Sequence, residues 1–163
     1  MDELVPREAL NAWRSLLQAH ATVIREIEAD LEERGLVPLE WYDLLIAIQS
    51  APDHRLRMRD VADTLVLTRS NATRLVDRLE TSDLMRRERL DTDRRGAVAV
   101  LTAKGRHALR RAWPTYARGI NRYFVDRLAA DELTTIDQAL TRVQAATRRA
   151  RPAPRRRRSR SLS

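Results

Sequence analysis

Apolar side chains recur at helical spacing along most of this chain, which predicts a mainly α-helical protein. In residues 4–34 the apolar positions advance by steps of three and four in alternation, the narrow seam along which one helix packs on another. Gly35 then stands where a helix commonly ends. The seam consists of Leu10, Trp13, Leu17, His20, Ile24, Ile27 and Leu31.

The next segment predicts three shorter helices. Pro38 suits the start of a helix, and residues 39–48 are apolar enough for a buried helix that ends before Pro52. Thr68 offers a hydroxyl cap for the third of these helices, with Asn71 three residues on. Single apolar faces define the second and third helices: Met58, Val61, Ala62 and Leu65 on one, and Ala72, Leu75, Val76 and Leu79 on the other.

The third of these helices also has a polar face, made of Ser70, Thr73, Arg74, Asp77 and Arg78. Short hydrogen-bonding side chains lie toward its start, and arginines follow one turn later. A helix in the DNA major groove needs that order, because its first turns meet base edges while its cations meet phosphates. A solvated surface that carries a few arginines is the alternative that this helix alone leaves open.

A hairpin follows this helix. Residues 84–90 and 97–101 predict two strands, and the charged, turn-forming residues 91–96 predict the loop between them. Helix, helix and hairpin in this order indicate a winged helix-turn-helix, in which the hairpin is the wing. The fold class expected is therefore mainly α with a small β-hairpin wing.

Both ends of the chain predict helices that a compact winged helix cannot bury. Thr102 can cap a helix to about Leu128, kinked at Pro114, and Asp131 can cap a last helix. The last helix again has apolar steps of three and four, through Leu133, Ile136, Leu140, Val143 and Thr147. We expect a helical dimerisation region from both termini. The predicted regions are the dimerisation helix 1–36, the winged helix-turn-helix 37–102, the dimerisation helices 103–150, and a disordered Arg-rich tail, 151–163.

The charge of the chain is concentrated in that tail. The formal net charge is +8, and the last 13 residues hold six arginines and no acid, so residues 1–150 carry only +2 (8 − 6). Such a tail has no apolar period and is expected to be disordered. Nonspecific phosphate contacts and a solvated segment without a dedicated role are equally open for it.

Composition excludes several classes of site. The chain has no cysteine, which removes disulfides, thiolate nucleophiles and cysteine metal sites. Its three histidines, His20, His54 and His107, lack the spacing of metal ligands, and no catalytic motif occurs, so we expect no metal, no cofactor and no enzyme. No apolar run is long enough to span a membrane, and Met1-Asp2-Glu3 is unlike a signal peptide, so a cytoplasmic location is expected.

Two motifs resemble those of the MarR family of transcriptional regulators. Residues 93–102 read DRRGAVAVLT and are similar to the D-x-R-G-x-x-x-x-L-T wing signature of that family, and residues 73–80 resemble its recognition helix. The resemblance covers about residues 5–148. It implies a homodimeric, sequence-specific DNA-binding regulator, most often a repressor, on a pseudo-palindromic operator. The alternative is an architectural or nonspecific DNA-binding protein that responds to no effector.

The resemblance and the helix pattern together nominate DNA contacts. The candidates for base edges are Ser70, Asn71, Thr73 and Arg74, and the candidates for phosphates are Thr68, Arg69 and Arg78. Arg95 matches the wing-tip arginine of the family and is expected in the minor groove, with Arg94 on the backbone of the DNA. Asp93 is expected to hold the wing by pairing with an arginine.

The family usually binds a small-molecule effector where the dimer helices meet the winged helix. Trp13, His20, Tyr42 and Asp43 are the residues of this chain that we expect at such a pocket. For His20 and Asp43 a structural role, as a packed histidine and as a capping or paired carboxylate, is the favoured alternative. The lack of cysteine excludes the cysteine redox switch that occurs within the family.

Overall fold

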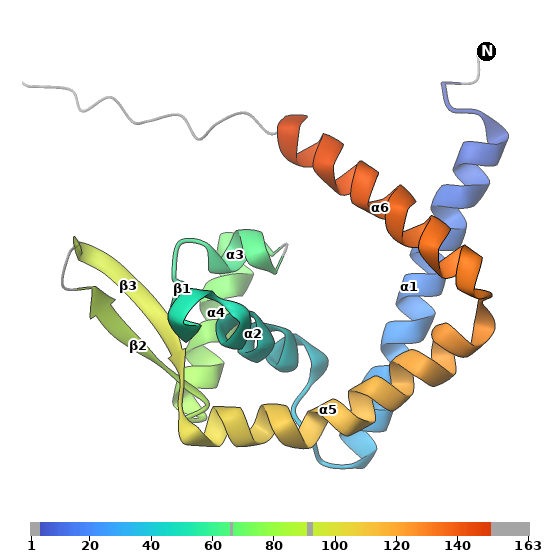
Figure 1. Ribbon diagram of the computed structural model, residues 1–163. Coiled ribbons are helices and arrows are strands. Elements are labelled where there is room, and N and C mark those ends of the chain that lie inside the picture. The colour runs from blue at the N-terminus through green and yellow to red at the C-terminus, as the bar shows by residue number, and fades with distance from the viewer. Residues whose placement is uncertain (1–3, 66, 91–92, 151–163) are drawn as a thin grey trace, which may run out of the picture. The chain divides into compact units, whose positions relative to one another are not determined.

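The computed structural model describes residues 4–65, 67–90 and 93–150, with the side chains of 90, 93–95 and 148–150 left aside (Figure 1). The chain forms two compact units, which divide between Phe124 and Val125. The first unit contains α1 (Arg7–Glu33), α2 (Leu39–Ser50), a 3-10 turn (Pro52–His54), β1 (Leu56–Arg57), α3 (Val61–Thr64), α4 (Arg69–Thr81), β2 (Met85–Leu90), β3 (Asp93–Leu101) and α5 (Ala103–Tyr123). The second contains a 3-10 turn (Val125–Arg127) and α6 (Ala130–Ala150).

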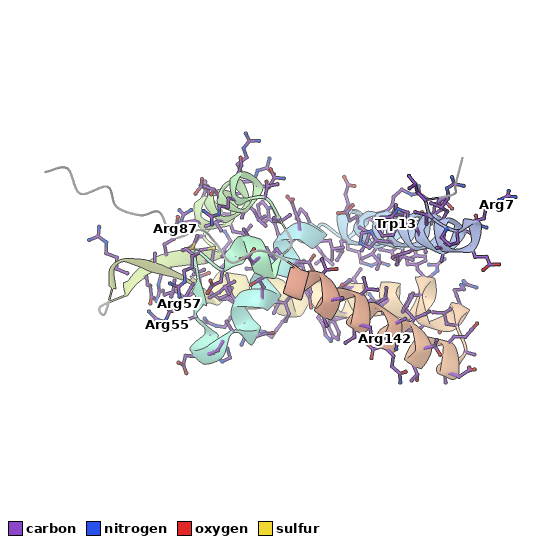
Figure 2. The ribbon with its side chains drawn as sticks, turned by 90° about the horizontal axis from the view of Figure 1, so that it is seen from above. Arg7, Trp13, Arg55, Arg57, Arg87 and Arg142 are labelled. Atoms are coloured by element: carbon purple, nitrogen blue, oxygen red, sulfur yellow. The ribbon has the colours of Figure 1, made fainter. Side chains whose placement is uncertain are left out.

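The predicted seam of α1 is divided into two halves with different environments. Ile27 and Leu31 are buried in the first unit, whereas Trp13 is 57% and Leu17 49% exposed. Figure 2 labels Trp13 on α1. The helix ends as predicted, because Gly35 adopts φ +59° and the amide of Leu36 donates to the Leu31 carbonyl at 3.0 Å. Within the first unit, the second half of α1 is therefore the half that packs against other elements.

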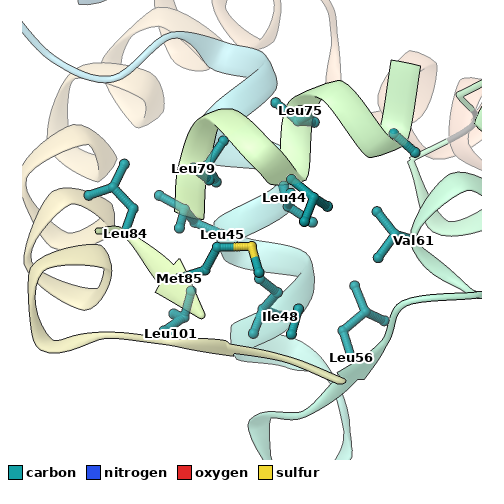
Figure 3. Close-up of a cluster of buried hydrophobic side chains, with 13 residues drawn as sticks. Leu44, Leu45, Ile48, Leu56, Val61, Leu75, Leu79, Leu84, Met85 and Leu101 are labelled. Carbon is teal, nitrogen blue, oxygen red and sulfur yellow. The ribbon is translucent and has the colours of Figure 1, made fainter. Parts of the chain in front are cut away.

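The core of the winged helix is built around α2. Leu44, Leu45 and Ile48 are fully buried, and they lie between α4 and the sheet (Figure 3). The predicted apolar face of α4 meets them, since Ala72, Leu75, Val76 and Leu79 are all buried. This packing orients α4 so that its polar face is exposed.

A second apolar cluster joins α1, α2 and α5. It contains Ile27, Leu31, Leu39, Tyr42 and Ala112. Tyr42 packs edge-on against Tyr116 of α5, with ring centroids 4.9 Å apart. Because α2 contributes to both clusters, it is the element that connects the long helices of the first unit with the winged helix.

The sheet has three antiparallel strands in the order β1-β3-β2, one strand more than the sequence predicted. The added strand, β1, pairs Leu56 with Ala99, and its two residues are too few to produce a periodic pattern. The predicted loop 91–96 is also too long: β3 begins at Asp93, which pairs with Leu90 after a register shift. Charged residues form turns and also solvent-exposed strands, so their charge alone misplaced this boundary.

Two predicted helix boundaries near the C-terminus are wrong. α5 ends at Tyr123 rather than near Leu128, because Phe124 leaves helical geometry and a 3-10 turn follows. The apolar spacing continues across this break, and periodicity therefore did not reveal it. α6 begins at Ala130, so Asp131 lies inside its first turn, and the Glu132 carboxylate accepts the Ala129 amide at 2.8 Å instead.

Two predictions lie outside the described residues: the disorder of 151–163 and the conformation of the wing turn at 91–92. Among the described residues, no helix has the length and apolar character needed to cross a membrane.

The start of α5 is fixed against the turn between α4 and β2. Thr102 caps the helix by accepting the Gly105 amide at 3.0 Å, and its hydroxyl donates to the Asp83 carbonyl at 2.7 Å. A Cβ atom on Gly105 would lie 1.9 Å from the backbone oxygen of Leu84. Glycine is required here because a rigid backbone atom occupies the space of a side chain.

We expect Gly105→Ala to lower the free energy of unfolding by about 3 kcal/mol, since the backbone at Leu84 must move to admit the methyl group. Gly119→Ala is the matched control, because its Cβ would meet only the Ile27 side chain, 2.8 Å away. Gly119→Ala should lower the free energy of unfolding by about 1 kcal/mol, and the further change Ile27→Val should remove this loss. Urea denaturation measures both, and a Gly105→Ala protein as stable as wild type would contradict the close approach.

Candidate nucleic-acid interface

The first turns of α4 present a polar surface whose geometry comes from the helix cap. Thr68 is extended (φ −69°, ψ 151°), and its hydroxyl accepts the Asn71 amide at 3.3 Å, as predicted. The cap satisfies one of the free amides of the helix start. The side chains of Arg69, Ser70, Asn71, Thr73 and Arg74 are all exposed around it.

These side chains differ in whether the protein already uses them. The Thr73 hydroxyl donates to the Arg69 carbonyl at 2.9 Å, which fixes its orientation. Among the described residues, the side chains of Asn71 and Arg74 have no hydrogen-bond or ion-pair partner. They therefore remain available for contacts outside the chain. Arg78, near the end of α4, instead pairs with Glu40 of α2 at 3.5 Å.

An ion cluster binds α4 to the wing. The Arg87 guanidinium of β2 binds Asp77 and Glu80 of α4, and the Arg87 amide donates to Glu80 at 2.9 Å. Burial lowers the pKa of Arg87, but hydrogen bonds and attraction from the two carboxylates outweigh it, so the pKa is raised. Asp77, which the sequence placed on the DNA-facing stripe, is thus a structural residue of this cluster.

Arg87 and Glu80 are site residues that sequence analysis missed. The signal available was weak, namely two carboxylates three residues apart on one helix and an arginine in the following strand. Their pairing depends on how the strand packs beside the helix, which periodicity does not give. We name Arg87, Asp77 and Glu80 the wing clasp.

The opposite side of β2 holds a second set of charges. Glu88 pairs with Arg86 at 2.7 Å and with Arg55 at 2.8 Å, and these arginines lower the pKa of its carboxyl. Arg55, Arg57 and Arg87 gather around the base of the β-ribbon (Figure 2). Arg55, Arg86 and Arg87, each paired with a carboxylate, therefore hold β2 from both of its faces, whereas Arg57 forms no ion pair with the described residues.

Beside the tip of the wing, residues 93–95 are described only in their backbone. Asp93, Arg94 and Arg95 lie in β3, so the strand extends to the predicted DNA contacts. Their side chains lie outside the described residues, and the expected roles of Arg95, Arg94 and Asp93 stay predictions.

The predicted effector residues are divided between two places. Tyr42 is buried against Tyr116, while its neighbour Asp43 is half-buried beside a shallow hollow of about 330 Å³. Burial, and then repulsion from Glu28, raises the pKa of Asp43. Trp13 and His20 are exposed on the first half of α1 and do not share that environment within one chain. The hollow is lined by Asp43, Ile46, Ala47, Ser50, Thr64 and Leu65.

Among the described residues, no three histidine or carboxylate side chains are grouped so that they could hold a metal ion.

Comparison with known proteins decides the family. Residues 35–96 match a family model described as "MarR family". The Bacillus subtilis (strain 168) protein YkoM, named as an uncharacterized HTH-type transcriptional regulator, is 30% identical over 76% of this chain and 78% of its own length. The chain belongs to the MarR family. Its relatives are transcriptional regulators, which removes the enzyme alternative.

Solved structures of MarR-family regulators share the whole architecture. Sco3205 of Streptomyces coelicolor, solved in complex with DNA, is 28% identical with a TM-score of 0.81, and the match covers 93% of each chain. PcaV of the same organism, solved with its natural ligand, is 28% identical with a TM-score of 0.67, over 90% of this chain and 97% of PcaV. The predicted winged helix-turn-helix fold is confirmed, with three strands in its sheet.

We expect Arg87→Ala to lower the free energy of unfolding by about 1 kcal/mol at low salt, because two carboxylates lose a partially exposed partner. Urea denaturation with a double-mutant cycle against Glu80→Ala should return a coupling that weakens as salt rises.

Arg86→Ala is the control for this change, since Arg86 lies next to Arg87 in β2 and Glu88 keeps Arg55 when Arg86 is lost. A coupling of zero between Arg87 and Glu80, or an equal loss in the Arg86 variant, would show that the wing clasp contributes nothing specific.

Proposed function

We propose that this MarR-family protein is a homodimeric, sequence-specific DNA-binding regulator, and a repressor whose operator binding responds to a small-molecule effector. The observation that carries the proposal is the exposed first part of α4, where Asn71 and Arg74 have no partner among the described residues. The DNA complex of the relative Sco3205 supports the same use of the fold here. DNA as target also places the protein in the cytoplasm.

Each recognition helix enters a major groove by its first turns. Ser70, Asn71, Thr73 and Arg74 contact base edges, while Thr68, Arg69 and Arg78 contact phosphates. Arg78 must exchange its exposed Glu40 partner for a phosphate, which is a small cost because surface ion pairs contribute little. On the wing, Arg95 enters the minor groove, Arg94 contacts the DNA backbone, and Asp93 steadies the turn.

A second copy of the chain covers the apolar surface that the protomer leaves exposed. On α1, Trp13, Leu16 and Leu17 are each at least 40% exposed, and on α5 Trp113 is 52% exposed. Large apolar side chains that a protomer leaves exposed favour association over exposure to water. The resulting twofold symmetry places two recognition helices about 34 Å apart, which corresponds to a pseudo-palindromic operator.

Repression and its release follow from this geometry. A dimer seated on an operator denies that stretch of duplex to other proteins. An effector that prefers a different spacing of the two winged helices shifts the population away from the DNA-binding form. The ligand complex of PcaV supports a ligand-responsive regulator, and Asp43, Tyr42, Trp13 and His20 are our candidates for the pocket.

The first test is selection of binding sites from a random pool of duplex DNA at physiological salt. We expect recovery of a twofold pseudo-palindrome whose half-sites are one helical turn apart. Recovery of no motif, together with steeply salt-dependent binding, would favour the architectural alternative and contradict the regulator.

Variants then assign the contacts on the selected operator. Arg74→Ala should relax the base preference at one position in each half-site, whereas Arg95→Ala should cost about 1–3 kcal/mol of binding free energy. Arg57→Ala, which removes one arginine from β1 rather than from the tip of the wing, is the matched control. Unchanged affinity and salt slope for Arg95→Ala would overturn the wing assignment.

We expect Asp43→Asn to raise stability at pH 7. The pKa of Asp43 in the folded protein lies above its ordinary value, so between these two values the folded protein binds more protons than the unfolded protein. The free energy of unfolding of the wild type therefore falls as pH rises through this window. The variant should lose this dependence in thermal unfolding. If Asp43 also contacts the effector, addition of effector no longer releases the Asp43→Asn variant from the operator. We expect the same loss of response for Trp13→Ala. A stabilised variant with intact response would restrict Asp43 to a structural role.

A further inference from the structure

α5 carries charge of one sign only. Its 21 residues include six lysines and arginines and no aspartate or glutamate. By contrast, the five arginines at 55, 59, 78, 86 and 87 in the winged helix each pair with a carboxylate. Charge without a compensating partner over a whole helix requires a reason, because it opposes folding through self-repulsion.

Four of these cations share one face. Lys104, Arg111, Arg118 and Arg122 follow one another at steps of seven, seven and four residues, which keeps them within about 40° of one another around the helix. All four are exposed, and the line they form is about 27 Å long at 1.5 Å per residue. We name these four residues the α5 basic stripe.

The stripe is distinct from the other surfaces of α5. The buried face of the helix contains Gly105, Ala112, Thr115 and Gly119. The exposed Trp113, which we assign to the dimer, follows Arg111 by two residues and so lies about 200° around the helix. A second copy that covers Trp113 therefore leaves the stripe open.

The stripe is also distinct from the operator-binding face. Lys104 donates to the Ser82 carbonyl at 2.8 Å, just beyond the last residue of α4. Asn71 lies ten residues before Thr81 on that helix, about 15 Å away along its axis. From Lys104 the helix runs away from the wing toward α1 (Figure 1). The stripe therefore begins about 15 Å from the proposed base contacts and continues away from them.

The stripe has no neutralising partner within the described part of the chain. None of its four cations forms an ion pair there; Arg118 donates to the Thr115 hydroxyl at 3.1 Å, and Arg122 lies 5.3 Å from the centre of the Tyr123 ring. Asp30 of α1, an acid close to the end of the stripe, accepts the Tyr123 hydroxyl at 3.1 Å. The charge therefore remains available to an external polyanion.

We propose that the α5 basic stripe binds the phosphate backbone of a second DNA duplex, so that a dimer on its operator holds another DNA segment. A linear row of cations fits a linear row of phosphates. The stripe has no exposed aromatic ring for stacking bases, which disfavours single strands, and no apolar anchor, which disfavours a protein partner. Operator binding keeps flanking DNA at high effective concentration beside it.

The test is capture of a second duplex. Operator DNA is immobilised and saturated with the full-length protein, and a labelled duplex of mixed sequence without operator is added over a range of salt. Wild type should retain the second duplex. Arg111→Ala with Arg118→Ala should weaken that retention about tenfold and lower the salt slope by about two, while operator affinity stays unchanged.

The control removes the same charge elsewhere: Arg110→Ala, on another face of α5, with Arg142→Ala on α6. It should retain the second duplex as wild type does. The Arg-rich residues 151–163 are identical in all these proteins, so their contribution is common to every measurement.

Three outcomes would overturn the proposal: wild type that binds operator but no second duplex, equal losses in the stripe and control variants, or tighter capture of single-stranded RNA of the same length than of duplex. If wild type binds no operator at all, the proposed regulator fails instead. In that case the binding of the stripe variant and of the control variant to the mixed-sequence duplex alone tests whether the stripe binds DNA.

Discussion

The position of the recognition helix relative to the wing depends on the wing clasp. α4 has 13 residues, a length at which an isolated helix is marginal in water, so its order comes from tertiary contacts. Apolar packing on Leu44, Leu45 and Ile48 sets which face of α4 turns inward, but such contacts are not directional. The fork of Arg87, held by Asp77 and Glu80, adds direction and ties the helix to one strand register. The proposed DNA contacts require α4 and the wing at a fixed separation.

The basic residues of this protein form two kinds of surface. On one kind they pair with carboxylates of the same chain, and on the other they have no such partner among the described residues. Around the ribbon, Arg55, Arg86 and Arg87 are satisfied by carboxylates and act as braces. At the start of α4 and along the α5 basic stripe, cations have no such partner among the described residues. The same residue type thus has a structural role in one place and a proposed binding role in another, and only its neighbours distinguish the two.

The sequence predicted what depends on neighbours along the chain. The Thr68 cap, the Gly35 helix end and the buried face of α4 are local patterns, and all three are confirmed. The two-residue β1 was missed because it exists only through pairing with β3, and Arg87 was missed because its acids are ten and seven residues away on another element. The α4 face of the site was therefore predictable, whereas the clasp that positions it was not.

α2 is the element that would carry a displacement among the long helices to the proposed DNA-binding surface. Its first turns contribute Leu39 and Tyr42 to the cluster with α1 and α5, and its later turns contribute Leu44, Leu45 and Ile48 to the winged-helix core. Close-packed interiors transmit displacement rather than absorb it. A ligand that wedges beside Tyr42 or Asp43 would therefore move the helix on which α4 rests. α1 is buried in the first unit by its second half only, so the proposed dimer contact on its exposed half would carry that displacement to the other protomer.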